Sequence, residues 1–167
     1  EKRLDANLKL IDNFVTQGFK KNQIFITGRS CGGWMTMMLL ARHQNIVAGG
    51  ISFVPECYGR LTKNYKVKKV GAEEALKKFR KKDGPGPADM RQMQIDEIIK
   101  SKNLPVLVFT HPKDPFGGLL SDWVEKAPGV ERIVVSEDNK VNGKSCKVWG
   151  KSIKDFHDID RADCFKE

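Results

Sequence analysis

Residues 23–34 read QIFITGRSCGGW, and this stretch decides the fold of the 167-residue chain. Residues 23–27 are rich in Ile and Phe, which predicts a short buried strand, and residues 34–43 predict a strongly apolar helix. The Gly-Arg-Ser-Cys-Gly pattern between them is typical of a sharp turn that exposes the hydroxyl of a nucleophilic serine. We therefore expect Ser30 to be a catalytic nucleophile. The alternative is a glycine-rich turn in which Ser30 only caps the helix.

Two glycines flank Ser30 at equal distances along the chain. We expect a side chain at Gly28 or at Gly32 to collide with the strand and the helix that meet at the turn, and Gly33 to extend the room for close packing. Cys31 lies inside the same turn and is expected to be a small buried side chain. The pattern thus predicts a strained serine whose hydroxyl stands clear of the sheet.

Strand and helix patterns alternate along the rest of the chain. This alternation predicts an α/β fold in which a mostly parallel sheet carries helices on both faces, as a single domain over residues 1–167. Residues 56–103 are expected to form a basic helical insertion or lid. The other expected strands are 47–54, 105–110 and 131–136, and the expected helices are 4–17, 73–82, 89–100, 118–126 and 158–166, with a hairpin turn at Asn142-Gly143.

The chain carries a net charge of +9, and residues 60–100 contain twelve basic and six acidic side chains. Such a stretch can attract an acidic substrate, a membrane surface or a nucleic acid, or it can be a solvated helix face. The sequence contains no nucleic-acid-binding motif, so we expect no nucleic-acid partner. It also contains no run of eighteen apolar residues, so we expect no membrane span.

Four cysteines are present, and none has the C-x-x-C spacing of a zinc site, so we expect no metal ion and no cofactor. Cys146 and Cys164 could form a disulfide if the protein is exported, with free thiols as the alternative. That pairing would favour a secreted or periplasmic location over a cytoplasmic one. The state of Cys57 is left open.

The chain resembles the C-terminal part of an α/β hydrolase, closest to the dienelactone hydrolase and prolyl-oligopeptidase-like branches. The resemblance rests on the turn around Ser30 and on the chain order of serine, aspartate and histidine. Asp114 follows the expected strand 105–110 in the segment THPKDPF, and His157 follows in KDFHD, before the expected last helix.

The resemblance implies a role for each of these residues. His157 would take the proton of Ser30, Asp114 would orient the imidazole, and the backbone N–H of Cys31 would donate to an oxyanion. Three alternatives stay open: Asp114 as an ordinary turn residue, His157 as a surface loop residue, and His111 as the base. The implied activity is hydrolysis of a small carboxylic ester through an acyl-enzyme. A serine peptidase and a non-catalytic binding protein of the same fold are the alternatives.

The sequence departs from this family before the turn. A complete α/β hydrolase has several strands ahead of the nucleophile, whereas only the helix 4–17 precedes residues 23–27 here. We therefore expect the strand 23–27 to lie at an edge of the sheet and the second oxyanion donor to be absent. An N-terminal half that was lost, was cleaved or belongs to a partner chain would account for the difference.

Overall fold

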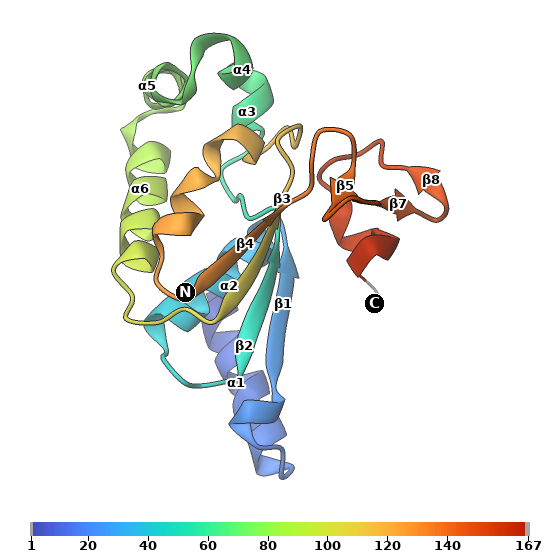
Figure 1. The fold of residues 1–167 in the computed structure, drawn as a ribbon. Helices are drawn as coiled ribbons and strands as arrows, with labels where there is room; N and C mark the ends of the chain where they lie inside the picture. The colour runs from blue at the N-terminus through green and yellow to red at the C-terminus, as the bar shows by residue number, and fades with distance from the viewer. Residues whose placement is uncertain (1, 166–167) are drawn as a thin grey trace.

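A four-stranded parallel sheet forms the centre of the computed structural model, which describes residues 2–165 (Figure 1). The strand order is β1-β2-β3-β4, so β1 lies at an edge, as predicted. Each neighbouring pair is parallel, which confirms the predicted α/β class. The strands are β1 (Phe25–Arg29), β2 (Gly49–Phe53), β3 (Val106–Thr110) and β4 (Val130–Val134).

Most of the remaining elements are helices, which precede, connect or follow these strands. In chain order the α-helices are α1 (Lys2–Thr16), α2 (Cys31–Arg42), α3 (Leu61–Asn64), α4 (Val67–Val70), α5 (Ala72–Asp83) and α6 (Pro85–Ile99). The 3₁₀ helices are η1 (Lys21–Gln23), η2 (Gly118–Leu120), η3 (Asp122–Lys126), η4 (Ile159–Arg161) and η5 (Asp163–Phe165). Two small antiparallel hairpins follow β4, namely β5 (Lys140–Val141) with β6 (Lys144–Ser145), and β7 (Lys147–Val148) with β8 (Lys151–Ser152).

The two faces of the sheet are covered in different ways. Side chains alternate along β3, so that Val106 and Val108 join a core with α1, α2 and α6, whereas Phe109 joins a second core on the opposite face. The second core is completed by the C-terminal segment, which contributes the hairpins and the 3₁₀ helices η4 and η5. Figure 1 shows α6 and this segment on opposite sides of the sheet. Helices therefore lie on both faces, but the α-helices pack on one face only.

The region between β2 and β3 divides into two parts. Ile95 and Ile98 of α6 belong to the main core, so this helix is part of the domain's scaffold. Helices α3, α4 and α5 instead pack around a smaller core of their own, which includes Tyr65 and Phe79. Whether this second part acts as a lid stays a prediction.

Several elements differ from their expected form. The expected helix 118–126 is two 3₁₀ helices, η2 and η3. The expected helix 158–166 is also split, into η4 and η5, and its residue 166 lies outside the described residues. The expected helix 89–100 begins earlier, at Pro85, because a proline in the first turn of a helix has a missing N–H that costs no hydrogen bond. None of the helices within residues 2–165 combines the length and apolar character that a membrane crossing requires.

Candidate active site

Ser30 joins β1 directly to α2 at the carboxyl end of the strand. Its backbone has φ 56° and ψ −125°, a combination that a side-chain-bearing residue adopts only when the surrounding structure imposes it. Two hydrogen bonds impose it here. The Ser30 N–H donates to Phe53 O of β2 at 2.9 Å, and the Trp34 N–H of α2 donates to Ser30 O at 3.0 Å. The strand-to-helix turn is therefore tighter than the sequence predicts, because β1 extends to Arg29 and α2 already begins at Cys31.

The glycines around Ser30 differ in what they allow. A Cβ at Gly28 would lie 2.3 Å from the carbonyl carbon of Gly32, which no side-chain movement relieves. A Cβ at Gly33 would lie 2.7 Å from Ser52 Oγ and 3.0 Å from Phe53 O, so α2 and β2 meet closely at this position. A Cβ at Gly32 would have no such neighbour within 4 Å. The expected collision is thus found at Gly28 and Gly33, and the expectation for Gly32 is wrong because its Cβ position faces open space.

Asp114 and His157 lie in direct contact, although 43 positions separate them in the sequence. The distance from His157 Nδ1 to Asp114 Oδ1 is 2.7 Å. A carboxylate only accepts hydrogen bonds, so Nδ1 carries the proton and Nε2 is left as the acceptor. The backbone N–H groups of Phe116 and Gly117 also donate to the Asp114 carboxylate, at 3.3 and 2.9 Å. These bonds fix a carboxylate that is only 1% exposed and, through it, the imidazole ring.

The His157 segment is tied to the turn that carries Ser30. Arg29, which precedes Ser30, forms an ion pair with Asp158, which follows His157. Arg29 Nε also lies 3.8 Å from Asp160 Oδ1. The His157 ring also stacks on Phe116, with 4.0 Å between the ring centroids, and this contact limits the movement of the imidazole. All three predicted triad residues therefore belong to neighbouring segments at the carboxyl end of the sheet.

The Ser30 hydroxyl itself donates to the backbone oxygen of Glu56, at 3.3 Å. Glu56, which lies three residues beyond the end of β2, is not among the predicted site residues. Its side chain is fully buried, where it accepts hydrogen bonds from the backbone N–H groups of Cys57 and Tyr58 and pairs with Arg91 of α6 at 3.1 Å. A charged residue directly after a buried strand was the available signal, because the carboxyl ends of parallel strands are where active sites form.

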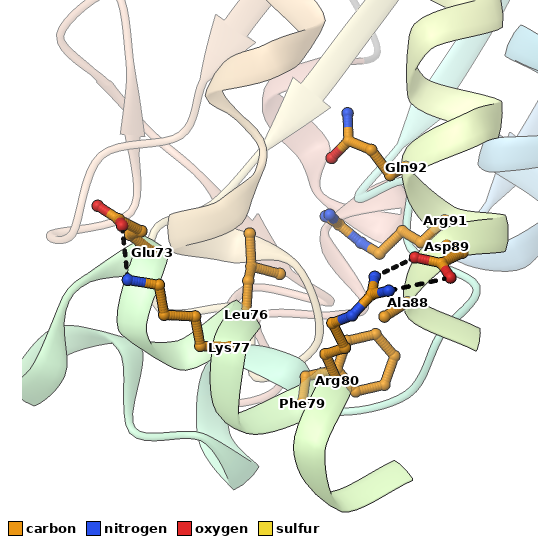
Figure 2. Close-up of a pocket in the computed structure, with 9 residues that line it drawn as sticks. All are labelled: Glu73, Leu76, Lys77, Phe79, Arg80, Ala88, Asp89, Arg91 and Gln92. Carbon is orange, nitrogen blue, oxygen red and sulfur yellow. Dashed lines mark hydrogen bonds and ion pairs between the residues drawn. The ribbon is translucent and has the colours of Figure 1, made fainter. Parts of the chain in front are cut away.

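Arg91, the partner of Glu56, also lines a cavity between α5 and α6. Figure 2 shows the cavity, of about 300 Å³, lined by residues of α5 and α6. An ion pair between Arg80 and Asp89 links the two helices at its rim. The guanidinium of Arg91 also donates to Leu120 O, at 3.3 Å. The buried arginine therefore joins α6, the segment after β3 and the segment that holds the Ser30 hydroxyl.

His111 makes contacts that exclude it as the base. Its Nδ1 accepts a hydrogen bond from the Lys113 N–H at 3.0 Å, and its Nε2 lies 3.0 Å from Asn139 Oδ1. Both ring nitrogens are therefore occupied, and the side chain is fully buried. Because Nδ1 accepts a hydrogen bond, it carries no proton, and burial lowers the pKa of His111 in the same sense. The residue holds the end of β3 to the segment after β4.

All four cysteines are paired in two disulfides, a state that the sequence leaves open for Cys57, Cys146 and Cys164. Cys146 pairs with Cys164, which is one of the two states that the sequence leaves open. Cys31 pairs with Cys57 and is half-buried, so the expectation of a small buried side chain in the turn is wrong. This second bridge fastens the residue after Ser30 to the residue after Glu56. Within residues 2–165, no group of three His, Cys, Asp or Glu side chains could hold a metal ion.

No protein-family model matches the sequence, and no curated protein matches it. Among solved structures, the chain is similar to a thermostable esterase, with 18% identity and a TM-score of 0.49 over 82% of this chain and 29% of that one. It is similar to an α/β hydrolase from the metagenome of sediments of the Mar Chica lagoon, Morocco, with 13% identity and a TM-score of 0.48 over 80% and 59%.

It is also similar to naproxen esterase (carboxylesterase NP) from Bacillus subtilis, with 16% identity and a TM-score of 0.45 over 77% and 56%. The chain spans less than two thirds of the length of each of these three structures. The branch within the superfamily, dienelactone hydrolase or prolyl-oligopeptidase-like, stays a prediction. In the arrangement of its strands and helices, the chain is similar to part of an α/β hydrolase.

Proposed function

We propose that the protein is a serine hydrolase that cleaves a carboxylic ester through an acyl-enzyme, with Ser30, His157 and Asp114 as its triad. The observation that carries the proposal is the 2.7 Å hydrogen bond from His157 to the buried Asp114, in a segment that an ion pair ties to the turn of Ser30. The alternatives of a surface histidine and an ordinary turn aspartate do not account for a buried carboxylate that is hydrogen-bonded to the imidazole. The strained backbone of Ser30 supports the same reading.

The reaction follows from the groups present. His157 Nε2 takes the Ser30 proton while Ser30 Oγ bonds to the ester carbonyl carbon. The imidazolium, stabilised by Asp114, then returns this proton to the departing alcohol as the carbon–oxygen bond breaks. Water attacks the acyl-enzyme in the same way, so that the carboxylic acid leaves and Ser30 regains its proton. The hydroxyl must first turn from Glu56 O towards the imidazole.

Charge on the carbonyl oxygen develops beside the start of α2. The first N–H groups of a helix have no partner within it, and Cys31 is the first residue of α2. The Cys31 N–H is therefore the proposed oxyanion donor, assisted by the positive end of the helix dipole. The disulfide to Cys57 supports this role because it fixes the residue that carries the donor.

A panel of p-nitrophenyl esters and aminoacyl arylamides tests the proposal. We expect turnover of short-chain esters by the wild-type protein and no turnover above background by Ser30→Ala. Cleavage of the arylamides alone would replace the esterase by a peptidase with the same triad. A folded protein that turns over neither class would overturn the proposal and favour a binding protein of the same fold.

A further inference from the structure

A hollow lies beside the segments that carry Asp114 and His157. It has a volume of about 370 Å³ and is lined by Arg60, Lys113, Pro115, Lys154, Asp155 and Phe156. These residues come from three segments: the one after β2, the one after β3 and the one that leads to His157. All three segments also supply parts of the candidate active site.

The lining is dominated by positive charge. Three of its residues are cations and one, Asp155, is an acid. Lys113 Nζ is partly engaged, because it donates to Glu137 O at 2.7 Å and lies 3.8 Å from Glu137 Oε2. The carboxylate of Asp155 accepts the backbone N–H of His157 at 3.0 Å. Within residues 2–165, neither Arg60 nor Lys154 forms an ion pair, so the hollow keeps unbalanced positive charge.

The hollow adjoins the reacting groups through Phe116. One contact of the Phe116 ring is the stack on His157, and the Arg60 guanidinium lies 5.3 Å from the centroid of the same ring. Lys113 directly precedes Asp114, and Asp155 is two residues before His157. A group bound by these cations would thus lie one aromatic ring away from the imidazole, within reach of the far end of a small ester.

We propose that this hollow is a subsite for a carboxylate, so that the enzyme's substrate is an ester carrying a negative charge away from the scissile bond. The inference rests on the proposed esterase function. Arg60 and Lys154 hold the carboxylate, and Pro115 and Phe156 bound the space for the apolar part of the substrate. The group that the hollow recognises is the carboxylate, and it can belong either to the acyl part or to the alcohol part of the ester.

Two matched substrate pairs test the subsite and separate these sources. Mono-p-nitrophenyl succinate against its methyl ester places the charge on the acyl part, and 4-acetoxybenzoate against its methyl ester places it on the leaving group. We expect kcat/KM to favour the charged member of one pair by about tenfold, and this ratio to fall with rising salt. Arg60→Gln with Lys154→Gln should bring the ratio close to one. Lys102→Gln, an exposed charge at the amino end of β3, should leave it unchanged.

A second readout does not require catalysis. Glutarate, as a simple dicarboxylate probe, should bind in calorimetry and should bind several-fold more weakly to the double variant. If the esters are hydrolysed but neither pair shows a preference and glutarate does not bind, the subsite is wrong and the esterase stands. If no ester is hydrolysed by a protein that binds glutarate through Arg60 and Lys154, the esterase is wrong and only the anion site stands.

Discussion

The turn that carries Ser30 and the segment that carries His157 are built by different means. The turn lies between a strand of the sheet and a long helix, and backbone hydrogen bonds fix it from both sides. The His157 segment contains only two-residue strands and 3₁₀ helices, and it is held by the Cys146–Cys164 disulfide, the Asp114 carboxylate and the ion pair with Arg29. Regular structure thus places the proposed nucleophile, and side-chain contacts place the proposed base.

The largest expected effect is a loss of kcat on replacing Asp114, which orients the proposed base. Asp114→Asn should lower kcat on a p-nitrophenyl ester by about 10⁴-fold, because an amide can donate to Nδ1 and so favour the wrong imidazole tautomer. The rate of p-nitrophenol release at saturating substrate measures the loss. Asp12→Asn on α1 serves as the control for the charge change. A decrease smaller than tenfold in a folded Asp114→Asn protein would remove Asp114 from the mechanism.

The second effect tests how the turn is packed. Gly28→Ala should lower the free energy of unfolding by about 3 kcal/mol or more, because its Cβ would overlap the backbone of Gly32. Gly32→Ala should change it by less than about 1 kcal/mol, since its Cβ position faces open space. Urea unfolding of the two variants measures the difference. Equal losses in both would contradict the assignment of the close approach to Gly28.

The third effect tests how the His157 segment is held. Replacing Cys146 and Cys164 together by serine should lower the free energy of unfolding by about 3 kcal/mol, the entropy of closing a loop of this length. It should also lower kcat, because the segment that carries the base becomes looser. Thermal unfolding and ester turnover are the readouts. An unchanged kcat in the double variant would show that Asp114 and Arg29 alone are enough to position His157.

The smallest expected effect is the contribution of buried His111 to the pH dependence of the free energy of unfolding. Burial lowers the pKa of His111 in the folded protein below 6.5, its ordinary value, so the unfolded chain binds a proton that the folded chain excludes. The stability that this neutral ring contributes is complete above about pH 6.5 and declines as the pH falls below it. Urea unfolding at high and low pH measures the decline. His111→Gln should reduce it, and an equal decline in the wild type and in a folded His111→Gln variant would contradict this source.

The same contrast decides what could be predicted from the sequence. The turn at Ser30 is a local pattern, so the strand, the turn and the start of the helix could be predicted from twelve consecutive residues, and the same pattern suggested Ser30 as the nucleophile. Which glycine meets the strand could not, because it depends on α2 starting at Cys31, and the structure places the contact at Gly33 rather than Gly32. Spacing alone does not determine how a helix is rotated on the sheet.

Long-range contacts were the least predictable. The chain order of Asp114 and His157 could be matched to a family pattern, but their contact depends on a segment with little regular structure. Four cysteines allow three pairings, and nothing in the spacing selects Cys31 with Cys57. The buried pair of Glu56 and Arg91 was missed because 35 positions separate the two residues and no local pattern links them. Only the tertiary structure distinguishes the buried members from the rest.

The joint action of the two regions is tested most directly by the rate at which a fluorophosphonate probe labels Ser30. Mass spectrometry of the peptide that contains residues 23–34 should find the label in the wild-type protein and none at this site in Ser30→Ala. In His157→Gln we expect labelling to slow by about 10³-fold, because the serine loses its base. A folded His157→Gln protein that is labelled as fast as the wild type, or a folded wild type that is never labelled, would contradict the account.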